Sequence, residues 1–328
     1  MKKAASFALG CKVNQYESEA IAELFAEKGY EIVGIDEEAD VYVINTCTVT
    51  NFGDKKSRQL IRKVKRQNEN AIVAVVGCYA QTAPKELMEI AGVNLVIGTK
   101  DRAQIVEMVE QYDRANGVEN HVSDIMKERV FEPLSIQKLA NRTRAYLKIQ
   151  DGCSQYCSYC IIPYARGPIR SREPQEVVAE VKRLAENGFK EVVLTGIHVA
   201  SYGKDRRDTS LLDILKQVHE VEGIERIRFS SIEPNVVTEE FAQTMAALPK
   251  VCDHFHLSLQ SGCDTTLERM NRRYRSAEYK ARCELLRKYF GNPALTTDVI
   301  VGFPMETEED FQASYDFVKD IYFYETHI

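Results

Sequence analysis

The sequence predicts an α/β protein, in which an N-terminal parallel-sheet domain is followed by a partial (β/α)6 barrel. Two observations support this prediction. Short β-branched or apolar runs alternate with amphipathic helical stretches in two successive series, a pattern typical of parallel sheets covered by helices. The length of 328 residues fits two domains, at about 150 residues per domain.

The first series predicts an N-terminal domain, residues 1–116. Its expected strands are apolar runs bounded by turn residues, and its expected helices have apolar positions at helical spacing. The strands are 4–9, 41–45, 71–76 and 93–97, and the helices are 18–28, 54–68, 84–91 and 102–114. Residues 117–143 mix charges with isolated apolar residues, which indicates a linker.

The second series predicts a C-terminal domain, residues 144–328. Its expected strands are 145–150, 191–195, 226–230, 254–259, 297–301 and 321–327, with helices such as 176–187 and 211–221 between them. Six strands alternating with helices favour a partial barrel, whose chemistry belongs at the carboxyl ends of the strands. Because the chain ends within the last expected strand, we expect its C-terminal end to be truncated.

The composition is that of an ordinary globular protein, with 44% hydrophobic and 28% charged residues, which excludes global disorder. No apolar run reaches the ~18 residues of a membrane-spanning helix, and the N-terminus turns polar too early for a signal peptide. A cytoplasmic protein without membrane contact is therefore expected. The net charge of −6 excludes binding to nucleic acid through overall charge, but not through a local basic face.

Nine cysteines are unusual for a cytosolic protein, in which disulfides are rare, so metal binding or catalysis is the leading interpretation. Cys153, Cys157 and Cys160 directly follow the first strand of the second series with the spacing Cys-x3-Cys-x2-Cys. Gly152 and its polar neighbours favour a loop that wraps its thiols around one centre. Three close thiolates suit an iron–sulfur cluster or zinc, although structural zinc usually has four protein ligands.

Another three cysteines lie at the strand ends of the first series. Because they come earlier in the chain, we call them the first triplet, and Cys153, Cys157 and Cys160 the second triplet. Cys11, Cys47 and Cys78 each follow an expected strand. Because parallel strands place their carboxyl ends on one edge of a sheet, the three thiols should converge there, where α/β sheets bind ligands. The alternative is that they are small buried apolar side chains, which is the role expected for the remaining cysteines. Those are Cys252, Cys263 and Cys283.

The cysteine triplet after the first barrel strand resembles that of the radical S-adenosylmethionine enzymes. This resemblance implies that Cys153, Cys157 and Cys160 hold a [4Fe-4S] cluster whose open iron binds S-adenosylmethionine. With both triplets, the chain resembles the methylthiotransferases, which combine an N-terminal cluster domain with a radical S-adenosylmethionine barrel. The matching segments are FALGCKVNQYESE, VINTCTVT, VVGCYAQ and GCSQYCSYCIIPYARGPIRSR.

Within that family, residues 10–18 resemble the branch that acts on N6-threonylcarbamoyladenosine in tRNA. The resemblance implies methylthiolation at C2 of this base at position 37, beside the anticodon, by a 5′-deoxyadenosyl radical. It implies that Cys11, Cys47 and Cys78 hold a second [4Fe-4S] cluster, which carries the sulfur. An electron donor such as flavodoxin or ferredoxin and a sulfur source are the further partners.

The methylthiotransferases usually continue into a small RNA-binding β-barrel domain called TRAM. Nothing in this sequence corresponds to it, so we expect the chain to be a fragment. Two other branches of the family act on isopentenyladenosine in tRNA or on a ribosomal-protein aspartate, and both remain alternatives. More distant alternatives are another radical enzyme that modifies a protein side chain, and a zinc-stabilised RNA-binding module.

Contacts to S-adenosylmethionine are expected at the ends of the barrel strands. The candidates are Thr195, Gly196, Glu233, Gln260, Ser261 and Asp298. Each has an ordinary alternative as a turn or capping residue.

Contacts to the anticodon stem-loop are expected from two local basic runs. Residues 55–66 hold seven basic residues and no acid, and helical spacing separates them from an apolar face. The candidate phosphate contacts are Lys55, Arg58, Arg62, Lys65 and Arg66 in this run, and Arg166, Arg170 and Arg172 after the second triplet. The alternative for the first run is a solvated helix face.

Overall fold

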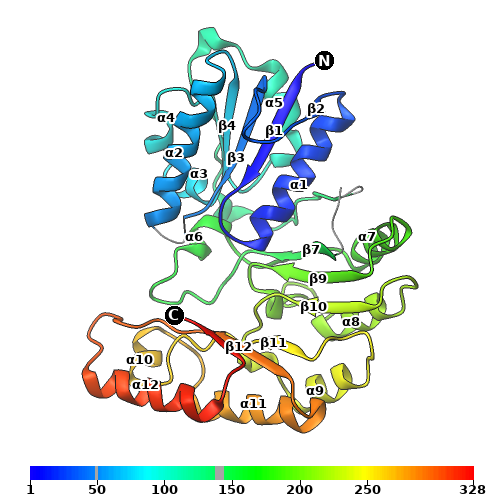
Figure 1. The fold of residues 1–328 in the computed structure, drawn as a ribbon, viewed down its shortest axis with the longest axis vertical. Helices are drawn as coiled ribbons and strands as arrows, with labels where there is room; N and C mark the ends of the chain where they lie inside the picture. Colours follow the sequence, from blue (N-terminus) through cyan, green and yellow to red (C-terminus); the bar gives the residue numbers. More distant parts are fainter. Residues whose placement is uncertain (49–50, 137–143) are drawn as a thin grey trace. The chain divides into compact units, whose positions relative to one another are not determined.

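The fold is taken from a computed structural model that describes residues 1–48, 51–136 and 144–328 (Figure 1). The described chain divides into two compact units. The first unit contains the chain up to residue 136, together with Asp151–Ser154 and Ile161–Arg172. The second unit contains residues 144–150, Gln155–Cys160 and Glu173–Ile328. The predicted domain limits at 116 and 143 stay a prediction, and residues 137–143 of the expected linker lie outside the described residues.

The first unit is built on a parallel sheet with the strand order β2-β1-β3-β4-β5-β6. Its strands are β1 (Lys3–Ala8), β2 (Glu31–Ile32), β3 (Val41–Thr46), β4 (Ile72–Gly77), β5 (Leu95–Ile97) and β6 (Glu119–Asn120). The four predicted strands are present. The two-residue edge strands β2 and β6 are too short to give a periodic signal, so the sequence did not reveal them.

Helices cover both faces of this sheet. They are α1 (Lys12–Glu27), α2 (Asn51–Gln67), α3 (Cys78–Thr82), α4 (Pro84–Met88) and α5 (Ile105–Gln111). Helix α6 (Ile162–Arg166) also belongs to this unit and packs against α3. Side chains alternate between the faces of a strand. Val41 and Val43 therefore pack in one core with α1 and α5, whereas Tyr42 and Ile44 pack with α2 in the other. Short η1 (Arg102–Gln104), η2 (Arg114–Asn116), η3 (Ile125–Lys127) and β8 (Arg170–Ser171) complete the unit.

Helix α1 begins at Lys12, six residues before the predicted start at residue 18. The predicted helix began only at residue 18, and the polar residues before it were given no structure. In the structure Asn14 and Glu17 are fully buried, and their polar partners, described below, stabilise the additional turns. The start predicted from periodicity was therefore wrong for a physical reason.

The second unit contains six parallel strands that follow one another in sequence order. They are β7 (Arg144–Asp151), β9 (Glu191–Gly196), β10 (Arg226–Phe229), β11 (His254–His256), β12 (Ala294–Asp298) and β13 (Glu325–His327). The bridge between Ile232 and Leu257 joins the β10 side to the β11 side. The strands β10-β9-β7 and β11-β12-β13 thus belong to two sheets that such bridges join, and the predicted partial barrel is confirmed.

Helices follow the strands of this unit, as predicted. They are α7 (Pro174–Glu186), α8 (Leu211–His219), α9 (Glu239–Ala246), α10 (Asp264–Arg269), α11 (Ser276–Phe290) and α12 (Glu308–Ile321), with η4 (Val199–Ser201) and η5 (Pro234–Val236). The fifth strand lies three residues earlier than predicted, because its pairing with β11 begins at Ala294. In the part of the chain that the structure describes, no helix is long and apolar enough to cross a membrane.

Candidate functional site

Three neighbouring strands of the first unit end at one edge of the sheet, and each is followed by a cysteine. The register pairs Ala8 of β1 with Asn45 of β3, and Thr46 of β3 with Gly77 of β4. Cys11, Cys47 and Cys78 come directly after these strand ends, with Cys11 exposed and the other two buried. The topology therefore places all three cysteines after strands that end at one edge of the sheet, and the convergence of their thiols on one centre stays a prediction.

Two glycines with left-handed backbone let the cysteine loops pack closely. Gly10 has a φ of 94°, and a Cβ added to it would lie 2.6 Å from Cys47 Sγ. Gly77 has a φ of 95°, and its added Cβ would lie 2.3 Å from Asn45 Oδ1. Carbon cannot approach these atoms so closely, so only glycine leaves Cys47 in its present position.

Replacing Gly10 with alanine should lower the free energy of unfolding by about 2–4 kcal/mol, because backbone strain and overpacking both contribute. Gly29→Ala is the matched control, since Gly29 has a φ of 85° but no atom within 4 Å of its added Cβ. The control should show the strain alone, about 1 kcal/mol. Urea unfolding measures both free energies. If the two variants lost equal stability, Cys47 would not obstruct a Cβ at position 10.

A fully buried arginine connects this edge of the sheet to α1. Arg166 donates from Nη1 to Glu17 Oε1 at 2.6 Å and from Nη2 to Asn14 Oδ1 at 2.6 Å. Its Nε donates to Cys78 Sγ at 3.1 Å. Asn14 in turn donates to the carbonyl oxygens of Leu9 and Thr46, at 2.8 and 2.9 Å. One side-chain network therefore holds the ends of β1 and β3 and the thiol that follows β4.

The charges in this network compensate one another. Glu17 also forms an ion pair with Arg102, which pairs with Glu132 as well. Burial alone would lower the pKa of Arg166, but the negative groups around it raise the pKa well above the ordinary value, so this arginine stays charged. Burial raises the pKa of the Cys78 thiol to about 11, although the Arg166 guanidinium opposes the rise.

The second basic run that the sequence offered for RNA contact lies in the interior. Arg166, Arg170 and Arg172 are 0%, 2% and 3% exposed. Arg170 donates to the carbonyl oxygens of Arg166 and Pro168, at 2.9 and 3.0 Å. The predicted surface patch is therefore corrected: these arginines hold backbone and buried acids, because the carbonyls and acids of the first unit surround them.

The second triplet lies in an irregular loop after β7, as predicted. Gly152 has a φ of 73°, and an added Cβ would lie 1.9 Å from the carbonyl oxygen of Pro168. Cys153, in the first unit, donates its backbone N–H to the carbonyl oxygen of Gly167 at 3.0 Å. Cys157 and Cys160 belong to the second unit.

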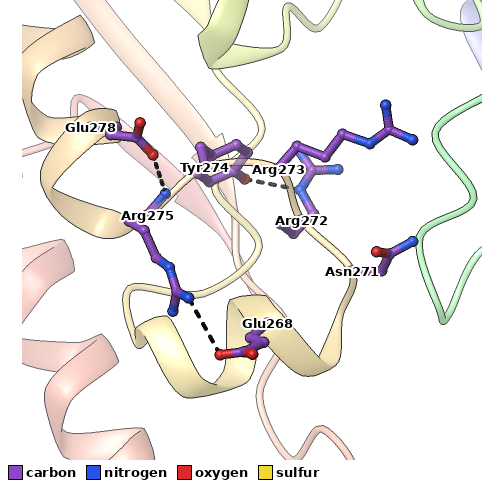
Figure 2. A pocket seen from close by; sticks show the side chains of 7 residues that line it. All are labelled: Glu268, Asn271, Arg272, Arg273, Tyr274, Arg275 and Glu278. Carbon is purple, nitrogen blue, oxygen red and sulfur yellow. Dashed lines mark hydrogen bonds and ion pairs between the residues drawn. The ribbon is translucent and has the colours of Figure 1, made fainter.

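A loop after α10 supports Cys157 within the second unit. Arg272 donates from Nη1 to Cys157 Sγ at 3.3 Å, and Asn271 donates to the carbonyl oxygen of Tyr156 at 2.8 Å. Arg272 also stacks on Tyr274, with 4.9 Å from guanidinium to ring centre. Asn271, Arg272 and Tyr274 help to line a hollow of about 290 Å³, and Figure 2 shows their side chains. A cation thus contacts one thiol of each triplet.

Several of the residues that the sequence offered for binding S-adenosylmethionine already contact other residues of the second unit. The Thr195 hydroxyl donates to the carbonyl oxygen of Val193 at 3.1 Å. Gly196 leaves room for Gln150, whose Oε1 lies 2.8 Å from an added Cβ. Gln260 has a φ of 69°, and the buried Ser261 accepts the backbone N–H of Cys263 at 3.2 Å.

Two acids at these strand ends pair with histidines. Glu233 lies 3.2 Å from His198 Nε2 and accepts from Gln155 at 2.9 Å. Burial raises the pKa of Glu233, but the hydrogen bond from His198 together with the charges of His198, Arg272 and Lys204 leaves the pKa below the ordinary value. The hydrogen bond from His256, at 3.1 Å, likewise lowers the pKa of Asp298. Both acids are therefore carboxylates at neutral pH.

Cys78 beside Arg166 and Cys157 beside Arg272 fit a metal–thiolate centre. Sulfur is a soft ligand, and each arginine supplies a positive charge next to it. Across residues 1–48, 51–136 and 144–328, however, no group of three His, Cys, Asp or Glu side chains is placed so that it could hold a metal ion. Both cluster sites therefore stay a prediction.

The first basic run forms the predicted amphipathic helix, α2. Ile61 and Val64 are buried, whereas Lys55, Arg58, Arg62 and Arg66 are exposed. Some of these cations have local partners: Arg58 pairs with Glu86 at 3.0 Å. Lys65 donates to the carbonyl oxygens of Glu69 and Ala71 at 2.6 and 2.9 Å, so its amine caps the end of the helix.

Sequence reasoning missed several polar residues of these sites. They are Asn14, Glu17 and Arg102. For Asn14 and Glu17, a signal was present, since polar residues three apart directly after Cys11 share one face of a helix. Nothing local marks Arg102.

Comparisons with known proteins found family models and relatives that match this chain. Residues 147–318 match the Radical SAM superfamily, and residues 3–98 match the Uncharacterized protein family UPF0004. The chain is 49% identical over its whole length to the threonylcarbamoyladenosine tRNA methylthiotransferase MtaB of Bacillus subtilis, and covers 73% of that protein. It is 37% identical over 96% of its length to the tRNA-2-methylthio-N(6)-dimethylallyladenosine synthase of Dictyoglomus thermophilum, and covers 72% of it.

Among solved structures, the fold is similar to that of TsrM from Kitasatospora setae, a radical S-adenosylmethionine methyltransferase. The TM-score is 0.73 at 16% identity, over 99% of this chain and 72% of that chain. At this identity the likeness concerns the fold alone.

Proposed function

Since this chain belongs to the radical S-adenosylmethionine tRNA methylthiotransferases, we propose that its substrate is N6-threonylcarbamoyladenosine at position 37 of tRNA. It is an enzyme, a transferase of the radical S-adenosylmethionine superfamily. The observation that carries the choice of base is the 49% identity to a relative named for that nucleoside, against 37% to one named for dimethylallyladenosine. The product would be 2-methylthio-N6-threonylcarbamoyladenosine.

Cys153, Cys157 and Cys160 would hold the [4Fe-4S] cluster that reductively cleaves S-adenosylmethionine, and Cys11, Cys47 and Cys78 a second one that carries sulfur. Arg272 and Arg166 would each donate a hydrogen bond to a ligating sulfur. Such hydrogen bonds stabilise the thiolate form that a metal requires.

The strand ends of the second unit would bind S-adenosylmethionine. Glu233 and Asp298 are carboxylates that can accept from ammonium or hydroxyl groups, and Gly196 permits close backbone approach. Thr195 and Ser261 would act through backbone groups, because their hydroxyls already have partners. Gln260 would act through its side-chain amide, because its backbone N–H and carbonyl oxygen bind Asp298 and Ile300. Their role is to orient the cofactor, since the difficult chemistry belongs to the cofactor itself.

The exposed cations of α2 would contact phosphates of the anticodon stem-loop. Lys55, Arg58, Arg62 and Arg66 stand on the helix face opposite to its buried residues. Contacts of this kind position RNA without reading its sequence. Lys65 would contribute less than predicted, because it caps the helix. An electron donor of the flavodoxin or ferredoxin type and a sulfur source complete the reaction, which we place in the cytoplasm.

The reconstituted enzyme should convert tRNA bearing N6-threonylcarbamoyladenosine to the methylthio nucleoside under anaerobic, reducing conditions. Mass spectrometry of digested nucleosides detects the product. tRNA bearing isopentenyladenosine and ribosomal protein are the parallel substrates, and both should remain unmodified. Methylthio incorporation into either of these, with none into the first tRNA, would assign the enzyme to another branch of the family.

A further inference from the structure

A hollow of about 690 Å³ opens in the first unit between α2 and the carboxyl end of β1. Its volume lies in the range of about 300–1,000 Å³ that is common for small-ligand sites. We call it the α2–β1 hollow. It is lined by Phe7, Leu9, Lys56, Gln59, Leu60, Arg62, Lys63 and Arg66.

The apolar part of the hollow belongs to an incompletely covered strand. Phe7 is 36% exposed, whereas Ala5, two residues earlier on the same face of β1, is fully buried in the core beneath α2. Leu9 and Leu60 lie beside it in the hollow. An aromatic ring is thus left open where the cover by α2 ends.

The polar part of the hollow is strongly basic. Arg62 and Arg66 are exposed, and no hydrogen bond or ion pair joins either of them to another described residue. Lys63 pairs with Asp36, and no acid occurs within residues 55–66. Two guanidinium groups therefore remain available for anionic ligands on one side of the ring.

We propose that the α2–β1 hollow binds one unpaired nucleotide of the RNA, with its base on Phe7 and its phosphates on Arg62 and Arg66. An aromatic ring beside a basic groove is the combination with which proteins bind single-stranded nucleic acid. Gln59, which can donate and accept, is placed to reach the edge of the base. An acidic protein would satisfy the arginines but would leave the recessed ring without a partner.

The position of the hollow fits the proposed function, on which this inference rests. Leu9 lines the hollow, and Cys11 follows two residues later. The Leu9 carbonyl oxygen accepts from Asn14, the same side chain that binds Arg166. A nucleotide in the hollow would therefore hold the anticodon loop beside the cysteine edge of the sheet.

Binding of an anticodon stem-loop to the full chain tests the proposal. The probe is the stem-loop RNA with 2-aminopurine at one loop position at a time, whose fluorescence falls when the base stacks. Phe7→Ala should weaken binding about tenfold and abolish the fall at one position. Phe7→Leu keeps an apolar side chain without the ring, so it should show the same loss even if the alanine variant folds poorly.

The double variant Arg62→Gln/Arg66→Gln tests the phosphate contacts. The slope of log affinity against log salt concentration should decrease by about 1.4, at ~0.7 for each contact to single-stranded RNA. Lys28→Gln is the control, because Lys28 is an exposed cation of the same unit beyond the hollow. Wild-type affinity and stacking in Phe7→Leu would overturn the proposal. Unchanged RNA binding with weakened binding of an acidic flavodoxin would assign the surface to a protein.

Failure of this inference is distinguishable from failure of the proposed function. If wild-type enzyme methylthiolates tRNA but Phe7→Leu binds the stem-loop normally, only the hollow is wrongly assigned. If stacking depends on Phe7 but no tRNA is methylthiolated, the RNA site stands and the proposed reaction falls.

Discussion

Arg166→Met should lower the free energy of unfolding by about 3–5 kcal/mol, because it leaves a buried charge without its partner. The substitution removes the hydrogen bonds to Glu17 and Asn14, whose side chains are fully buried. Arg102 can compensate only part of the charge of Glu17, since it also pairs with Glu132. Urea unfolding, followed by a signal from the first unit, measures the loss.

A double variant separates this charge effect from lost packing. Glu17→Gln removes the negative charge, so Arg166→Met/Glu17→Gln should lose about 1–3 kcal/mol less than the sum of the two single variants. Arg129→Met is the control, because Arg129 is exposed and its side chain, among the described residues, binds backbone carbonyls and no acid. A loss below about 1 kcal/mol for Arg166→Met would show that the network does not hold the cysteine edge of the first unit.

Alanine at Cys157 and at Cys47 should give two different losses of activity. Cys157→Ala should reduce both 5′-deoxyadenosine formation and methylthiolation to background. Cys47→Ala should abolish methylthiolation but retain cleavage of S-adenosylmethionine, because cleavage needs only the other cysteine triplet. Chromatography of 5′-deoxyadenosine and mass spectrometry of nucleosides measure the two reactions in the same sample.

Iron content provides a readout that does not depend on activity. Two [4Fe-4S] clusters give about eight irons and eight sulfides per reconstituted chain, and each alanine variant should lose about half of them. Cys252→Ala should keep all of its iron. Cys252 lies neither at the cysteine edge of the first unit's sheet nor in the loop after β7. If Cys47→Ala retained its iron and its product, Cys47 would not be a ligand. Stoichiometric zinc in the wild-type protein would favour the zinc-stabilised RNA-binding module.

The sequence by itself determined the elements whose signal is local. The alternation of apolar runs gave the parallel sheets, and the spacing of Cys153, Cys157 and Cys160 marked a loop of three thiols. It also predicted that Cys11, Cys47 and Cys78 follow strands that end at one edge of the sheet, although the three residues are far apart in the chain. This was possible because parallel topology brings every strand end to the same edge, whatever the length of the connections.

Only the tertiary structure decided where the charges go. Arg166, Arg170 and Arg172 read as a basic surface run, yet they are buried, and Glu17, which neutralises Arg166, lies 149 residues away in the sequence. Arg272 likewise has a partner that is distant in the sequence, because it donates to Cys157, 115 residues away. A charged side chain tolerates burial only when a partner is present. Because that partner is supplied by the folded chain and not by sequence neighbours, no local pattern distinguishes a buried arginine from a solvated one.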